Sequence, residues 1–139
     1  MKKIIFILVA LFTISLFADK IYLEALGQNA AQELLAKGYK HVTGFNTGKL
    51  AKGDADYQVL NLYKGVEYSI VFGADDSKSS LTIEVYNQNF DMIKTKTITG
   101  DTYSSIDLSG LETGPYYVKI KAIETPVGGS GWFFQYSYK

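Results

Sequence analysis

Two short polar stretches carry the oxygen-bearing side chains that a metal site would need. Asn87, Asn89 and Asp91 alternate as the first ligands of a calcium loop do, and Asp75 and Asp76 form a second acidic pair. Calcium takes six to eight oxygen ligands, often from loops that carry Asp, Asn and backbone carbonyls. The first stretch lacks the glycine and the closing glutamate of an EF-hand. We therefore expect either calcium at these two stretches or ordinary hairpin turns, which also favour Asn and Asp.

Aromatic side chains on strand faces offer a second kind of chemistry. Tyr86, Tyr117 and Phe133 fall on faces opposite the main apolar stripes, where rings stack on sugars or dock a protein. The alternative is that an N-terminal helix covers this face, which equally explains its aromatic character. These three residues are therefore candidate ligand-binding residues, with both explanations open.

Catalytic chemistry finds little support in the sequence. His41 is the only histidine, and no Gly-x-Ser-x-Gly elbow is present, so neither a nucleophilic triad nor a zinc site with several histidines is expected. A small hydrolase would need paired carboxylates. They would have to come from loops that carry Asp54, Asp56, Asp75, Asp76 and Asp91. Because such loop carboxylates are usually solvated, we expect a protein that is not an enzyme.

The N-terminal residues indicate export. Two lysines precede an unbroken apolar run, Ile4 to Phe12, and Ala18 stands before a charged pair. This is the pattern of a secretory signal peptide over residues 1–18. The run is shorter than the roughly 20 apolar residues of a spanning helix. We therefore expect no stable membrane insertion after cleavage, and a periplasmic or secreted protein.

The composition excludes several classes of partner and site. The chain has 139 residues and no cysteine, so it forms neither disulfides nor thiolate metal sites. Lysine supplies every basic residue, and removal of the leader leaves a net charge of about −2. Arginine is the preferred residue for bidentate contacts with phosphate and guanine, so nucleic-acid binding is not expected.

The first element after the leader is a helix over Tyr22–Lys37. Leu23, Leu26, Ala30 and Leu34 form an apolar stripe at helical spacing, and Gly38 is a natural stop. The stripe predicts a helix that packs on the protein's own sheet; a helix that binds a partner is the alternative.

From Tyr57 onward the chain alternates with the period of two that is typical of half-buried strands. The clearest example is the strand after Gly114-Pro115, with Tyr116, Val118 and Ile120 on one face. Further strands are expected over Tyr57–Tyr63, Val66–Phe72, Leu81–Tyr86, Met92–Ile98, Thr102–Leu108 and Gly131–Tyr138, with a short one near Thr47–Ala51. Lys94 and Lys96 suit Met92–Ile98 to a sheet edge.

These elements predict a mainly β fold, an antiparallel β-sandwich of about seven to eight strands with jelly-roll or Greek-key connections and one N-terminal helix. The expected organisation is a signal peptide at 1–18, a helix and loop at 19–56 and the sandwich at 57–139. Residues 19–139 are expected to fold as one unit.

The order of the strands resembles the bacterial pre-peptidase C-terminal domain, a small secreted β-sandwich. The matching segments lie between about Asp54 and Lys139. They are Tyr57–Leu60 with Lys64–Ile70, Ser80–Tyr86 with its turn at Asn87–Asn89, Thr113–Ile120, and Gly131–Tyr138. The resemblance implies a noncatalytic accessory role, such as substrate or matrix binding, and calcium binding in some members. This chain contains no peptidase domain to assist.

The sequence therefore predicts a noncatalytic, exported binding or accessory module of the bacterial cell envelope that acts through a sheet face or loops. Its partner would be a protein or glycan of the envelope. A carbohydrate-binding module is the first alternative and a small carboxylate-dependent hydrolase is the second. No cofactor is expected apart from calcium.

Overall fold

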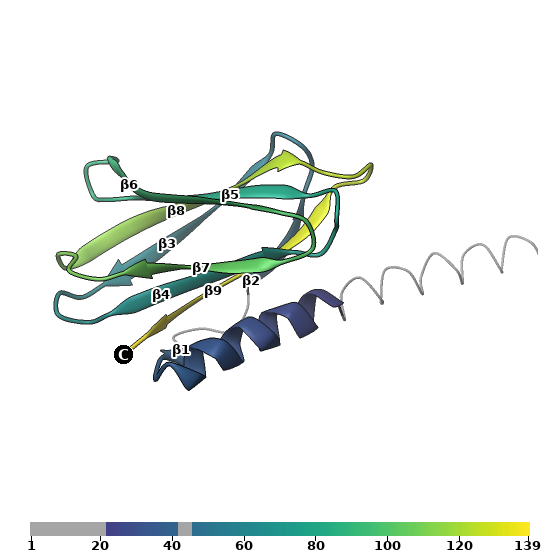
Figure 1. The fold of residues 1–139 in the computed structure, drawn as a ribbon. Coiled ribbons are helices and arrows are strands. Elements are labelled where there is room, and N and C mark those ends of the chain that lie inside the picture. Colours follow the sequence, from purple (N-terminus) through teal and green to yellow (C-terminus); the bar gives the residue numbers. More distant parts are fainter. Residues whose placement is uncertain (1–21, 42–45) are drawn as a thin grey trace, which may run out of the picture.

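The computed structural model describes residues 22–41 and 46–139. The predicted signal peptide, residues 1–18, lies outside the described residues. The chain is helical over residues 22–36 and then forms strands (Figure 1). In the described ranges no helix is long and apolar enough to cross a membrane.

The strands form two antiparallel sheets. One sheet has the order β1-β9-β4-β7, with β2 also paired to β9, and the other has the order β3-β8-β5-β6. The strands are β1 (Lys40–His41), β2 (Asn46–Leu50), β3 (Ala55–Leu62), β4 (Tyr68–Ala74), β5 (Ser80–Tyr86), β6 (Met92–Thr99), β7 (Tyr103–Leu108), β8 (Gly114–Glu124) and β9 (Ser130–Tyr138). The predicted β-sandwich is confirmed. The described chain has nine strands rather than seven or eight. β2 corresponds to the short strand expected near Thr47–Ala51, and β1 is the strand that was not expected.

The core lies between the two sheets because each strand turns alternate residues inward. β5 shows this most clearly: Leu81, Ile83 and Val85 are fully buried, and the residues between them are not. The same core cluster takes residues from both sheets, among them Leu60, Ile83, Val118, Ile70, Phe72 and Phe134. β6 is an edge strand, as its lysines predicted.

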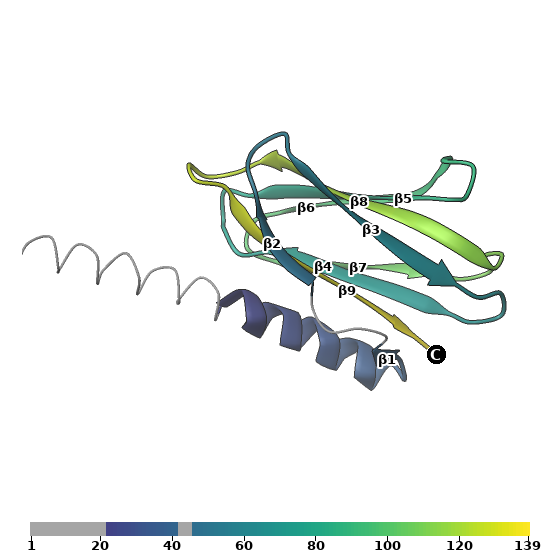
Figure 2. The same ribbon diagram turned by 180° about the vertical axis from the view of Figure 1, so that it is seen from behind.

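The helix covers the outer face of the five-stranded sheet (Figures 1 and 2). Ala30 and Leu34 pack in one cluster with Val71 of β4 and Phe133 of β9. β4 is therefore buried at every position, on one side by the core and on the other by the helix. The helix ends at Gly38, whose φ of 87° lies in the left-handed region. Glycine adopts this conformation without steric penalty because it has no Cβ. The prediction of a helix packed on the protein's own sheet is confirmed, and the outer face of the four-stranded sheet is left open.

Candidate functional site

One row of apolar side chains crosses the open face of the four-stranded sheet. Tyr117 of β8 lies directly opposite Val59 of β3 and Tyr86 of β5, and Tyr86 lies opposite Met92 of β6. Residues that lie opposite each other in a ladder share a face. Val59 and Met92 are more than half exposed, at 59% and 54%. The sheet thus presents an apolar row to solvent across all four strands.

The next row on this face is mostly polar. Tyr57 of β3 lies opposite Lys119 of β8, which lies opposite Glu84 of β5. The Tyr86 hydroxyl donates a hydrogen bond of 2.7 Å to Glu84 Oε2, and Lys119 Nζ lies 3.7 Å from the same oxygen. The hydrogen bond to Glu84 raises the pKa of Tyr86 above its ordinary value of 10. The carboxylate of Glu84 and the ammonium group of Lys119 therefore lie beside the aromatic rings.

Phe90 extends the aromatic row from the β5–β6 turn. Its ring stacks on Tyr117 with a centroid distance of 4.9 Å and an interplanar angle of 22°. The side chain is 68% exposed, so it adds little to the core. Its φ of 63° lies in the left-handed region, where a bulky residue is an outlier and glycine or asparagine is usual. An exposed ring held at a backbone cost is more typical of a binding residue than of a structural one.

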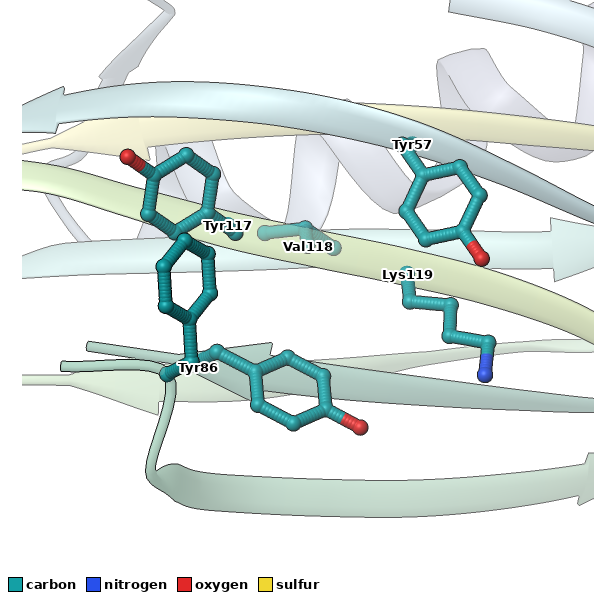
Figure 3. A pocket seen from close by; sticks show the side chains of 6 residues that line it. Tyr57, Tyr86, Tyr117, Val118 and Lys119 are labelled. Carbon is teal, nitrogen blue, oxygen red and sulfur yellow. The ribbon is translucent and has the colours of Figure 1, made fainter. Parts of the chain in front are cut away.

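Together these side chains line a groove of about 300 Å³ formed by Tyr57, Tyr86, Phe90, Tyr117, Val118 and Lys119. We call it the aromatic groove. Figure 3 shows the labelled rings of Tyr57, Tyr86 and Tyr117, from β3, β5 and β8, with the Lys119 chain between Tyr57 and Tyr86. A flat ring beside paired charges fits a ligand with both apolar faces and hydroxyl groups.

The structure brings together two of the three predicted ligand-binding residues. Tyr86 and Tyr117 lie side by side in the aromatic groove. The prediction that Phe133 belongs to the same binding face is wrong: Phe133 lies in the other sheet, beneath the helix, and is 1% exposed. Sequence reasoning missed Tyr57 and Phe90. Tyr57 has a signal, since it alternates out of phase with the buried Leu60, but the position of Phe90 depends on the turn geometry.

The first predicted calcium stretch is a tightly bonded turn. Asn87 Oδ1 accepts hydrogen bonds from the N–H groups of Asn89 and Asp91, at 2.9 and 3.0 Å. Asn87 Nδ2 also donates to Asp91 Oδ2 at 3.3 Å. This bonding is what a hairpin turn requires of an asparagine. An incoming calcium ion would have to compete with these hydrogen bonds for the side-chain oxygens. Calcium at this turn stays a prediction.

The second stretch also makes local hydrogen bonds. Asp76 Oδ1 accepts the N–H of Lys78 at 2.8 Å, and Asp75 Oδ1 accepts the N–H of Gly131 at 3.0 Å. Asp75 thereby ties the β4–β5 loop to the start of β9. Among the residues that the structure describes, no group of three or more His, Cys, Asp or Glu side chains is placed to hold a metal ion. Calcium at Asp75 and Asp76 likewise stays a prediction.

Replacing Asn87 by alanine distinguishes the two explanations of the turn. We expect Asn87→Ala to lower the free energy of unfolding by about 1–2 kcal/mol, because two backbone N–H groups lose their acceptor. The loss should be the same in EDTA and in millimolar calcium when measured by urea unfolding. A loss that appears only with calcium would instead assign a metal to the turn.

Comparison with known proteins agrees with this fold. A family model described as the secretion system C-terminal sorting domain matches residues 58–127. No curated protein matches the chain. The Yersinia pseudotuberculosis-derived mitogen is similar with a TM-score of 0.55 and 15% identity, over 67% of this chain and 82% of that chain. The pre-peptidase C-terminal domain of collagenase from Bacillus anthracis is similar with a TM-score of 0.50 and 13% identity, over 67% and 87%.

At such identities the two structures are informative about the fold alone, and they confirm the predicted resemblance to the pre-peptidase C-terminal domain at that level. The family model reaches further, because it matches half of the chain, from β3 into the loop after β8. The chain belongs to the family of secretion system C-terminal sorting domains.

Proposed function

We propose that the chain is a noncatalytic, exported accessory module of the bacterial cell envelope that binds its partner through the aromatic groove. The observation that carries this proposal is the apolar row on a sheet face that the helix leaves open, with the exposed ring of Phe90 stacked on Tyr117 beside it. Exposed apolar patches rimmed by polar side chains are typical of binding surfaces. The family's description, which concerns secretion and sorting, supports export. The folded unit would be residues 19–139, in the periplasm or secreted.

The stacked rings favour carbohydrate binding as the form that this function takes. Phe90 and Tyr117 provide a platform on which a pyranose ring can stack, and Glu84 and Lys119 can hydrogen-bond its hydroxyl groups. A protein partner with a dry apolar surface would have to desolvate both charges, which is costly. A glycan of the envelope is therefore the preferred partner, and a protein is the alternative.

The hydrolase alternative receives no support from the carboxylates. It needs two aspartates that converge in a cleft. Asp75 and Asp76 lie before β5, whereas Asp91 follows it at the far end of that strand. Asp56 accepts the N–H of Tyr57, with a distance of 2.7 Å. These side chains support turns and strand ends, so we retain a noncatalytic role.

Binding to soluble glycans tests the proposal. We expect the purified protein to bind at least one member of a panel of β-glucan, xylan, mannan and peptidoglycan fragments in calorimetry. We expect Tyr117→Ala to weaken that binding about tenfold, which corresponds to about 1.4 kcal/mol. Lys121→Ala, on the same strand and face but outside the groove, is the matched control. Equal effects of the two variants, or no binding by the wild type, would argue against a glycan ligand.

A further inference from the structure

The outer edge of β3 has backbone groups available for another strand. Within the described part of the chain, β3 pairs with β8 alone. The N–H of Ala122 donates to the carbonyl of Asp54, and hydrogen-bonded residues alternate along an antiparallel ladder. The even-numbered residues of β3 therefore face β8. Those with odd numbers, including Val59 and Asn61, direct their N–H and C=O groups to the open edge.

The two edges of this sheet differ in how they are protected. β6 carries Lys94 and Lys96 and pairs with β5 through a register shift at Val85/Tyr86, and both features discourage the addition of a strand. β3 contains neither lysine nor proline and keeps one register with β8 along its length. A protecting contact comes from Asp56, whose carboxylate accepts the outward N–H of Tyr57. The second half of β3 has no such contact among the described residues.

An apolar pocket opens beside this unprotected half. It has a volume of about 280 Å³ and is lined by Asn61, Tyr63, Val66, Tyr68, Tyr136 and Tyr138. We call it the tyrosine pocket. Tyr136 packs partly against the core, and burial raises its pKa. The Tyr68 hydroxyl oxygen accepts a hydrogen bond of 3.0 Å from the N–H of Tyr63. The pocket is therefore an apolar space at the end of an open strand edge.

We propose that the Val59–Asn61 edge and the tyrosine pocket form a site for an extended peptide, which joins the four-stranded sheet as a fifth strand. Strand addition combines main-chain hydrogen bonds along an edge with pockets for alternate side chains. The Val59–Asn61 edge supplies the main-chain hydrogen bonds, and the tyrosine pocket takes a side chain of the peptide. This site is separate from the aromatic groove and does not depend on the function proposed for it.

The occupant is a peptide with free side chains rather than β3 of a second copy. The inward residues of β3, such as Leu60 and Leu62, are already buried in their own core, so β3 of another molecule could not fill the pocket. A peptide antiparallel to β3 would place an apolar side chain opposite Leu62, at the pocket. About six positions later it would pass Asp56, since opposite residues match one to one, and a basic side chain there complements the carboxylate.

Synthetic peptides test this proposal directly. The probe is the acetylated and amidated nonapeptide Thr-Leu-Thr-Val-Thr-Val-Thr-Lys-Thr, and its variants have Ala for Leu or Glu for Lys. We expect the parent peptide to shift and protect the amides of Val59 and Asn61 in NMR spectra of the ¹⁵N-labelled protein. We expect each peptide variant to bind about tenfold more weakly.

Two exposed aromatic residues of similar accessibility give a matched pair of protein variants. Tyr63, at 62% exposure, lines the tyrosine pocket, whereas Phe90, at 68%, lines the aromatic groove and lies outside β3. We expect Tyr63→Ala to weaken peptide binding about tenfold and Phe90→Ala to leave it unchanged. Val59→Pro removes an outward N–H without breaking a ladder bond and should abolish binding. Equal effects of the two aromatic variants, or no amide protection by any peptide, would overturn the proposal.

Discussion

Replacing Phe90 by glycine is expected to abolish binding in the aromatic groove and to raise the free energy of unfolding by about 1 kcal/mol. The φ of 63° at Phe90 costs an L-residue about 1–2 kcal/mol, and glycine avoids that cost. The ring is 68% exposed, so its loss removes little buried surface. Binding suffers because Phe90 is the outer ring of the stack on Tyr117. Urea unfolding and glycan titration measure the two effects on the same protein.

Two further substitutions at this position separate the ring from the backbone strain. Phe90→Tyr keeps both, so binding and stability should match those of the wild type. Phe90→Ala removes the ring and keeps the strain, so binding should be lost without a gain in stability. If the glycine variant bound glycans as well as the wild type, Phe90 would have no role in the groove. If it were less stable than the wild type, the ring would serve the fold.

The strands could be predicted because their periodicity is local information. β5 and β8 alternate buried and partly exposed residues along their whole length, and each pattern is visible without knowing the partner strand. The helix and its glycine stop are equally local. β1 was not predicted because it is two residues long and forms only by pairing with β9 at the other end of the chain. β2, expected near Thr47–Ala51, pairs with the same strand.

The candidate site could be predicted only in part because it depends on register between distant strands. Alternation placed Tyr86 and Tyr117 on outward faces, but only pairing through β5 and β8 makes them neighbours. Phe133 obeys the same alternation and is nonetheless buried, because periodicity gives the face of a strand and not the layer that covers it. Alternation with the buried Leu60 indicates that Tyr57 faces outward, but its position beside Lys119 depends on the pairing of β3 with β8.

Replacing Phe133 by alanine is expected to lower the free energy of unfolding by about 3–5 kcal/mol, the usual range for a fully buried phenylalanine. Phe133 is 1% exposed and packs in the cluster that joins the helix to the five-stranded sheet. Its ring lies against Gly73. A Cβ added at Gly73 would collide with the Phe133 ring and would lie 2.7 Å from the carbonyl oxygen of Thr102. The cavity left by the ring would lie between the helix and β4, so the helix should loosen first. Urea unfolding followed by the fluorescence of the single tryptophan, Trp132, measures the loss.

The same variant decides between the structural and the ligand-binding interpretation of Phe133. A ligand-binding ring would lose affinity on truncation with little change in stability, whereas we expect Phe133→Ala to lose stability and, while folded, to bind glycans normally. Phe133→Leu fills most of the cavity and should recover more than half of the loss. Tyr117→Ala is the matched control: it should lose glycan affinity with little change in the free energy of unfolding. A stability change below about 1 kcal/mol in Phe133→Ala would mean that the helix does not depend on this ring, and that the outer face of the five-stranded sheet is accessible after all.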